Sequence, residues 1–405
     1  MAKRLTYKLP EVAFFQEGPG LRTHQWASDG MKVINVTNIL LDGSIDVSNT
    51  DKFISQSEFE TRYSHFAVEE NDIVVASSGN SYGKVGRIRA EHLPLMMNTS
   101  VIRFHSSQEH LLDQEYLHAF LRSSSFHAQV NAFVTGGAQP NFGPTHLKRM
   151  TISLPSLPEQ RGISHIITTY DEAIENNRRR MALLEKAACL LYEEWFVRLR
   201  FPGHEHTPIT RGLPEGWERM PASEAIEINP RTKLSDQDEH WYVEMADLSS
   251  DSMVIQNAIK CEGRSGSKFQ NGDTLLARIT PCLENGKTGF VDFMADGEVG
   301  RGSTEFIVLR PRRVTSEFVY CLSRTYHFRE NAIKSMVGSS GRQRVQESCF
   351  DKFQVLIPPK LLLNLFSESA CPIFRQILML HLQNQKLRAA RDLLLPRLMS
   401  GEIEV

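Results

Sequence analysis

Residues 163–195 read ISHIITTYDEAIENNRRRMALLEKAACLLYEEW, with mostly apolar residues at alternating spacings of four and three. This spacing is typical of the contact face of a coiled-coil helix, and it continues for roughly nine helical turns. A second run with the same spacing begins 203 residues later, at Phe366, and ends at Leu398. The sequence therefore predicts two long helices with apolar seams in a chain built from an internal repeat.

A segment of mixed character precedes each helix, and a stretch rich in proline and glycine separates the two halves. Prolines close to each expected helix start fit this division, because proline is tolerated in the first turn of a helix but not in its interior. We expect a first globular domain, a first long helix, a linker, a second globular domain, and a second helix with its tail, over residues 1–155, 156–200, 201–216, 217–358 and 359–405.

The two globular segments match each other in order, as strand-like and helix-like stretches recur at similar intervals. The matched pairs are 33–39 with 242–248, 71–76 with 272–277, 83–86 with 286–289, 99–104 with 304–309, and 116–126 with 318–328. We therefore expect an α+β fold, in which two similar globular domains are separated by two long antiparallel coiled-coil helices. An approximate two-fold axis would relate the two halves.

Connectivity sets the direction of the helices, because the first leaves domain one and enters domain two, where the second begins. If the helices pack, they must run antiparallel, with one globular domain at each end. In the fully overlapped register Asn177 falls opposite Asn384, where two amides could satisfy each other and fix the register. The alternative is that each amide faces water. The same register places Tyr170 opposite Arg391.

Composition narrows the class of protein. The 405 residues are 41% hydrophobic and 23% charged, as is usual for a soluble globular protein. No apolar run reaches the ~18 residues of a membrane span, the N-terminus has no signal-peptide core, and the six cysteines form no C-x-x-C pair. We expect a cytoplasmic protein with reduced thiols. Because the net charge is −2, any binding to nucleic acid must rely on local positive charge.

Motifs for catalysis or metal binding are missing from the sequence. Residues 286–288 end like a phosphate-binding loop, but position 281 is proline where that loop requires glycine. Residues 229–231 begin like the N-P-P-Y motif of adenine methyltransferases and then depart from it. His204 and His206 favour a solvated linker over a metal site. We therefore expect no catalytic residue, no metal and no cofactor in this chain.

Two similar domains held at a fixed distance suit a linear target with two parts. Duplex DNA is such a target, since its helix repeats every ~34 Å. Three segments of the chain then resemble the specificity subunit of type I restriction–modification systems. They are the region around LPEQR (157–161) and DEAIENNRRR (171–180), the stretch ARITPCLENGK (277–287), and the ending LLLPRLMSGEI (393–403). The first domain departs from the family pattern, with SSGNSYGK at 77–84.

The resemblance implies a non-catalytic subunit that reads a bipartite DNA site, one half with each target-recognition domain. The coiled coil would set the spacing and dock two methyltransferase subunits and restriction subunits, with no role for a membrane. S-adenosylmethionine, ATP and Mg²⁺ would be cofactors of those partners. The alternative is a coiled-coil adaptor that spaces two protein-binding domains and does not bind DNA.

Loop residues with polar or cationic side chains are the candidates for contact with double-stranded DNA. Base edges are read by Arg, Asn and Gln, and phosphates are bound by Lys, Arg, hydroxyls and backbone N–H groups. The alternative for each is a solvated side chain in a turn. The candidates in the first domain are Ser77, Ser78, Asn80, Tyr82, Lys84, Arg87, Gln139 and Asn141, and those in the second are Arg278, Thr280, Asn285, Lys287, Ser339, Ser340, Arg342, Gln343 and Arg344.

Overall fold

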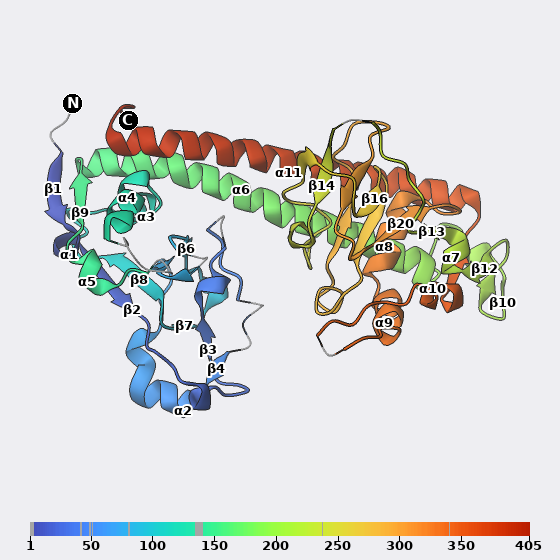
Figure 1. The fold of residues 1–405 in the computed structure, drawn as a ribbon, viewed down its shortest axis with the longest axis horizontal. Coiled ribbons are helices and arrows are strands. Elements are labelled where there is room, and N and C mark those ends of the chain that lie inside the picture. Colours follow the sequence, from blue (N-terminus) through green and yellow to red (C-terminus); the bar gives the residue numbers. More distant parts are fainter. Residues whose placement is uncertain are drawn as a thin grey trace. The chain divides into compact units, whose positions relative to one another are not determined.

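The chain folds into two compact units in the computed structural model (Figure 1). Unit 1 comprises Met1–Ala173 with Leu387–Val405, and unit 2 comprises Ile174–Lys386. Each long helix therefore contributes residues to both units. The structure describes residues 4–40, 43–47, 50, 52–79, 82–133, 141–236, 238–339 and 341–405.

Unit 1 contains two sheets and a separate strand pair. The antiparallel four-stranded sheet has the order β2-β8-β5-β6, and in the smaller sheet β3 lies antiparallel to β4 and parallel to β7. The strands are β1 (Leu5–Lys8), β2 (Ala13–Glu17), β3 (Met31–Ile34), β4 (Phe53–Ile54), β5 (Ile73–Ala76), β6 (Val85–Arg87), β7 (Met96–Met97), β8 (Val101–Ser106) and β9 (Thr151–Leu154), which pairs with β1. The short helices are α1 (Leu9–Val12), α2 (Gln56–Glu58), α3 (Gln114–Leu121), α4 (Ser124–Phe133) and α5 (Pro144–Leu147).

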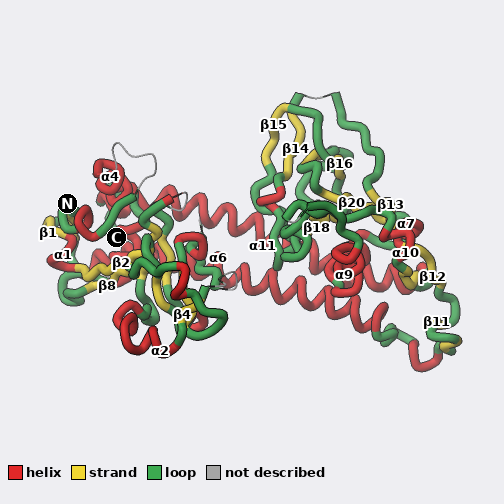
Figure 2. The backbone as a smooth tube through the Cα atoms, turned by 60° about the horizontal axis from the view of Figure 1, so that its bottom comes forward, coloured by secondary structure: helices red, strands yellow, loops and turns green. Residues whose placement is uncertain are grey.

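Unit 2 repeats this topology with its own elements. Its main sheet has the order β13-β20-β17-β18, and its second sheet has the order β15-β14-β19-β16. Figure 2 shows β14 and β15 side by side. The strands are β10 (Ile209–Thr210), β11 (Leu213–Pro214), β12 (Glu218–Pro221), β13 (Ile226–Ile228), β14 (Glu239–Val243), β15 (Ile259–Glu262), β16 (Ser267–Phe269), β17 (Thr274–Ala277), β18 (Thr288–Phe290), β19 (Gly300–Gly302), β20 (Phe306–Pro311) and β21 (Gln354–Ile357). The short helices are α7 (Ala222–Ala225), α8 (Ser316–Arg324), α9 (Tyr326–Lys334) and α10 (Cys349–Lys352).

The two units share one fold, as the sequence predicted. The strand order β2-β8-β5-β6 corresponds to β13-β20-β17-β18, and the pair β1-β9 corresponds to β12-β21. In the second sheets, β3 of unit 1 and β14 of unit 2 each have one antiparallel and one parallel neighbour. Among the described strands, β16 and the antiparallel pair β10–β11 of unit 2 have no counterpart in unit 1. The α+β class with a repeated domain is thus confirmed.

Strands β5 and β17 lie in the interior of the two main sheets and are buried on both faces. This burial explains why they are nearly all apolar. Leu276 of β17 packs into the core that contains α8, whereas Leu275 packs into a second core beneath β14. In unit 1, Val75 and Val74 of β5 divide in the same way. A strand with two covered faces needs apolar side chains at every position rather than at alternate positions.

The helical stretch after β8 and after β20 breaks in both units. The sequence indicated helical character across each break, but a new helix starts at residue 124 in unit 1 and at 326 in unit 2. The hydroxyls of Ser123 and Thr325 accept hydrogen bonds from the N–H groups of Phe126 and Phe328, at 3.3 and 3.4 Å. These caps satisfy amides at the start of the new helix.

Two long helices, α6 (Leu157–Tyr192) and α11 (Lys360–Ser400), complete both units. In unit 1 the beginning of α6 packs with the end of α11, through a core that includes Ile163 and Leu398. In unit 2 the ring of Trp195, just beyond α6, lies 6.1 Å from the ring of Phe366 near the start of α11. The helices are therefore antiparallel in each unit, as predicted from connectivity.

The seam contains the polar pair that the register placed there. Nδ2 of Asn177 donates to Oδ1 of Asn384 at 2.9 Å, and Nδ2 of Asn384 donates to the carbonyl of Ile174 at 3.1 Å. Both asparagines are buried. Arg391, expected opposite Tyr170, donates to Oδ1 of Asp171 at 2.6 Å.

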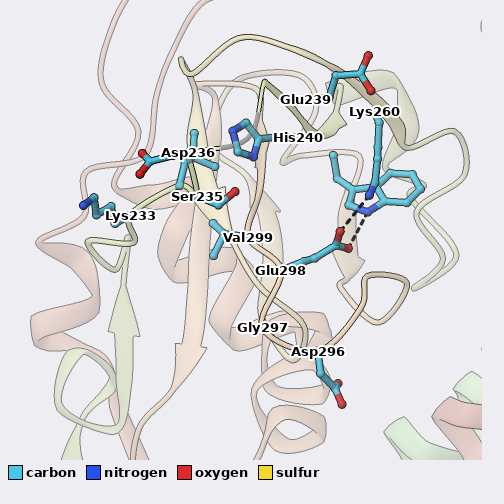
Figure 3. A pocket seen from close by; sticks show the side chains of 12 residues that line it. Lys233, Ser235, Asp236, Glu239, His240, Lys260, Asp296, Gly297, Glu298 and Val299 are labelled. Carbon is cyan, nitrogen blue, oxygen red and sulfur yellow. Dashed lines mark hydrogen bonds and ion pairs between the residues drawn. The ribbon is translucent and has the colours of Figure 1, made fainter.

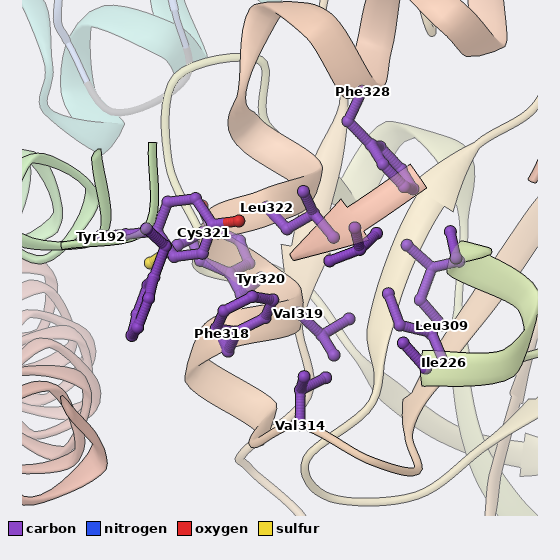
Figure 4. Packing of buried hydrophobic residues seen from close by; sticks show 14 of the residues in the cluster. Tyr192, Ile226, Leu309, Val314, Phe318, Val319, Tyr320, Cys321, Leu322 and Phe328 are labelled. Carbon is purple, nitrogen blue, oxygen red and sulfur yellow. The ribbon is translucent and has the colours of Figure 1, made fainter. Parts of the chain in front are cut away.

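The core of unit 2 joins its sheet to α6. Figure 4 shows Phe318 and Tyr320 of α8 close to Tyr192 of α6, and the rings of Phe318 and Tyr192 are 4.9 Å apart. Among the described residues, no helix combines the length and apolar character needed to cross a membrane.

Candidate nucleic-acid interface

Two loops meet at the end of β17 in unit 2. The first, residues 278–287, joins β17 to β18, and the second, residues 335–348, joins α9 to α10. Ile279 and Val337 each form an isolated antiparallel bridge with Arg344. We call these two segments the unit 2 loop pair.

Thr280 and Gln343 tie the loop pair together with a reciprocal pair of hydrogen bonds. The N–H of Thr280 donates to the carbonyl of Gln343 at 3.0 Å, and the N–H of Gln343 donates to the hydroxyl of Thr280 at 3.0 Å. Thr280 is buried, so its hydroxyl is committed to the fold. Both residues were candidates for DNA contact, and the structure gives them a part in holding the loops.

Two arginines of α8 and α9 support the first loop from behind. Arg324 donates to the carbonyl of Gly286 at 3.1 Å, and Arg329 donates to the carbonyl of Glu284 at 3.1 Å. Gly286 has φ +82°, and a Cβ there would lie 2.9 Å from Nη1 of Arg329. Asn285 lies between the two supported carbonyls and is exposed. The loop thus presents the Asn285 amide on a fixed backbone.

Two of the predicted cations are engaged within the fold. Nζ of Lys287 donates to the carbonyl of Met245 at 2.9 Å. Arg344 makes three hydrogen bonds to the carboxylate of Glu305, at 2.6, 2.9 and 3.0 Å. These bonds from Arg344 lower the pKa of Glu305. Any anion that bound Arg344 would have to compete with this ion pair.

Other candidates in the unit 2 loop pair face solvent. Arg342 and Ser339 are exposed, and the N–H of Arg342 closes a turn by donating to the carbonyl of Ser339 at 2.9 Å. The side chain of Arg278 is 26% exposed, with Nη1 3.8 Å from a carboxylate oxygen of Glu347. Asn285, Ser339 and Arg342 are therefore candidates of this loop pair whose side chains are exposed.

Unit 1 holds its corresponding loops together in the same way. Ser78 forms an antiparallel bridge with Asn141, and the N–H of Phe142 donates to the carbonyl of Ser77 at 3.0 Å. In unit 2 the equivalent bridge joins Ile279 to Arg344. Two similar loop pairs therefore sit on matching scaffolds and carry different side chains.

Several unit 1 candidates have partners inside the unit. The hydroxyl of Tyr82 donates to Oδ1 of Asn131 at 3.0 Å, and burial raises the pKa of Tyr82. Arg87 forms an ion pair with Glu115, and burial lowers the pKa of Arg87. The side chain of Ser77 is fully buried.

Among the remaining unit 1 candidates, Ser78 and Lys84 are partly exposed and Asn141 is exposed. Asn80, Gln139 and Ser340 lie outside the described residues.

Two cavities of unit 2 differ in the charge of the residues that line them. The pocket in Figure 3 has a volume of about 460 Å³ and is lined by four carboxylates and two lysines. Oxygens of Glu298 accept from Lys260 at 2.9 Å and from the Trp241 indole at 3.1 Å. A pocket with this excess of carboxylates repels phosphate.

A second cleft, of about 280 Å³, is lined by Arg231, Lys268 and Arg278. Sequence reasoning singled out Arg278 only. The other two cations come from segments far from the loop motifs, and no local pattern marks them.

Known proteins resemble this chain in sequence and in fold. Residues 6–186 match the family described as type I restriction modification DNA specificity domain. A specificity subunit of the type I restriction enzyme MjaIX, from Methanocaldococcus jannaschii, is 22% identical over 305 residues, which cover 72% of this chain and 69% of that protein. The chain is therefore similar to specificity subunits of type I restriction–modification systems, and its first 186 residues include a match to their DNA specificity domain.

Two further relatives illustrate the breadth of this specificity-subunit family. The EcoEI specificity subunit of Escherichia coli is 34% identical over 154 residues, or 36% of this chain and 26% of that protein. The crystal structure of a type I system S subunit from M. genitalium has a TM-score of 0.52 and 14% identity, and covers 98% of this chain and 96% of its own. At that identity the likeness supports the fold alone.

Proposed function

We propose that this chain reads a bipartite site in double-stranded DNA, one half with each unit, for a type I restriction–modification complex. The observation that carries the proposal is the repeated loop pair, which has the same backbone pairing but different exposed side chains in the two units. Such an arrangement suits two readers with different base preferences. The expected domains 1–155 and 217–358 would be the two target-recognition domains.

The exposed candidates match the chemistry of base reading. Asn285 and Arg342 of unit 2, with Asn141 of unit 1, can make bidentate contacts to base edges. Arg87 and Arg344 would act on DNA only indirectly, because carboxylates of their own units pair with them. We therefore propose that reading falls mainly to side chains without an internal ion pair.

The remaining activities would belong to partners. Two methyltransferase subunits that bind S-adenosylmethionine, and restriction subunits that use ATP and Mg²⁺, would dock on the chain. The long helices α6 and α11 are the proposed docking ground and would fix the distance between the two half-sites.

The test is the adenine methylome of the host with and without this gene. The proposal expects one split methylated motif to disappear on deletion and to return when the gene is restored. An adaptor that spaces two protein partners without binding DNA would leave the methylome unchanged, and that result would refute the proposal.

A second experiment tests whether each unit reads only one half-site. Arg342→Ala should change the base preference of one half-site only, because Arg342 lies in the unit 2 loop pair. Arg344→Ala should have the weaker effect, because its guanidinium is bonded to Glu305. A change in both half-sites with Arg342→Ala would contradict the assignment of one reader to each unit.

A further inference from the structure

The small cleft of unit 2 gathers positive charge from segments that are distant in the sequence. It lies between the connection after β13, the start of β16, the start of β20 and the first residue of the β17–β18 loop, and it has a volume of about 280 Å³. Arg231, Lys268 and Arg278 contribute its cations, and none of its described lining residues is acidic. A concave surface lined by one sign of charge concentrates the opposite ion.

Arg278 links the cleft to the unit 2 loop pair. Its carbonyl accepts a hydrogen bond from the N–H of Val345 at 2.9 Å, while its side chain lines the cleft. Nε of Arg278 is buried without a hydrogen-bond partner among the described residues, and the nearest counterion, Glu347, is 3.8 Å away. A buried donor left unpaired is destabilising, so an anion within reach would be stabilising.

The walls of the cleft are held in place by hydrogen bonds. Asn229 adopts φ +48°, and its amide both accepts from the N–H of Val308 at 2.9 Å and donates to Glu347 at 2.8 Å. Nζ of Lys268 donates to the carbonyls of Arg264 and Gly266, each at 2.6 Å. An ammonium group has three protons, which leaves one for a ligand.

We propose that this cleft binds a phosphodiester of the DNA backbone and sets the register of the unit 2 reader. The inference rests on the proposed function, because it places the backbone of the same duplex whose bases the loop pair reads. Arg231 and Arg278 supply the charge, and Lys268 supplies a donor. The acidic pocket in Figure 3 is unsuited to this role.

The cleft also predicts that the two units differ in how strongly they bind the phosphates of DNA. Ser77 stands in unit 1 where Arg278 stands in unit 2, since the carbonyls of both accept the matching hydrogen bond from the second loop. A buried serine hydroxyl cannot neutralise a phosphate. Unit 2 should therefore contribute more than unit 1 to the dependence of binding on salt.

The experiment uses the full chain assembled with its methyltransferase subunits, and a duplex that carries the split motif found in the methylome. Affinity is measured over a series of salt concentrations for the wild type, Arg231→Glu and Arg278→Gln. Each lost phosphate contact lowers the slope of log affinity against log salt by about 1 and leaves base preference unchanged. The matched control is Arg219→Glu, which reverses an exposed cation on β12, outside the cleft.

Glu347→Gln provides a change of opposite sign. Its carboxylate contacts both Asn229 and Arg278, so its neutralisation should strengthen duplex binding several-fold. Slopes of Arg231→Glu and Arg278→Gln equal to that of Arg219→Glu would overturn the cleft contact while the wild type still binds. Failure of the wild type to bind any duplex would instead overturn the proposed function. Melting temperatures identify a variant that fails to fold, and Glu347→Gln then remains as the test.

Inorganic phosphate distinguishes a site for free phosphate from a contact with a phosphodiester of the DNA backbone. It is added at constant ionic strength in place of chloride. If phosphate binds the wild type but not Arg278→Gln, and duplex affinity is the same for both, the cleft is a site for free phosphate and the backbone contact is wrong. Loss of duplex affinity in Arg278→Gln supports the backbone contact.

Discussion

Each unit attaches its pair of short helices to α6 through an arginine and a carboxyl group, but the two contacts differ in strength. In unit 1, Arg122 of the α3–α4 turn and Arg391 of α11 both bond to Asp171 of α6. In unit 2, Arg324 at the matching position lies 3.8 Å from Glu185 of α6. One fold therefore uses two different solutions to the same packing problem.

The difference appears in the direction in which the pKa of each carboxyl group is shifted. Burial opposes ionisation of Asp171, but the charges and hydrogen bonds of Arg122 and Arg391 lower its pKa overall. Burial raises the pKa of Glu185, and a hydrogen bond from Tyr320 offsets this only in part. Asp171 is the centre of an ion-pair network, whereas Glu185 acts mainly as a buried acceptor. Burial of a carboxylate is stabilising only where the partners match its charge.

The largest expected effect is the contrast between Asp171→Asn and Glu185→Gln, two changes that remove one charge with little change of shape. Asp171→Asn should destabilise unit 1 by about 3 kcal/mol, because it leaves Arg391, whose side chain is 8% exposed, without its main counterion. Glu185→Gln should cost less than about 1 kcal/mol, since an amide oxygen can still accept. Hydrogen exchange in α3 and α8 measures each unit separately. Equal losses for the two variants would remove the contrast.

The next effect isolates the role of Glu185 as an acceptor. Its carboxylate accepts from the hydroxyl of Tyr320 and, at 2.8 Å, from the N–H of Met253. Glu185→Ala leaves both buried donors unpaired and should destabilise unit 2 by about 2 kcal/mol. The measurement is the free energy of opening in α8, with Glu185→Gln as the matched control. The acceptor role would be refuted if the alanine and glutamine variants behaved alike.

A smaller effect concerns the polar pair in the seam. Asn177→Leu leaves Oδ1 of Asn384 without its partner and should cost about 1 kcal/mol. The double change Asn177→Leu with Asn384→Leu should recover that loss and weaken the preference for one register. Urea midpoints of the single and double variants decide this, and additive losses would contradict it.

The smallest effect is a pH dependence of opposite sign in the two units. Because the folded-state pKa of Glu185 is raised, its contribution is fully present below the ordinary value of 4.5 and is lost as pH rises through the folded value. Because the pKa of Asp171 is lowered, its contribution is present above 3.8 and is lost as pH falls through the lower folded value. Melting temperatures from about pH 4 to 8 should show Glu185→Gln gaining on the wild type as pH rises, with a constant deficit for Asp171→Asn. Parallel curves for both variants would exclude the difference.

Much of the fold was predictable because it depends on local periodicity. The seam spacing gave the long helices, and the order of the matched stretches gave the repeated sheet. The roles of the candidate cations were not predictable in this way. Arg344 and Arg87 look like DNA-binding residues in a loop sequence, but Glu305 and Glu115 pair with them across 39 and 28 positions in the chain.

The amino-acid sequence alone determined that two long helices exist and that they run antiparallel, because helical period and chain connectivity are properties of neighbouring residues. Tertiary structure decided which charges remain open to a ligand. Arg231, Lys268 and Arg278 come from three separate segments, and only folding brings them to one cleft. Electrostatic partners are chosen by distance in space, and for these side chains separation along the chain says little about that distance.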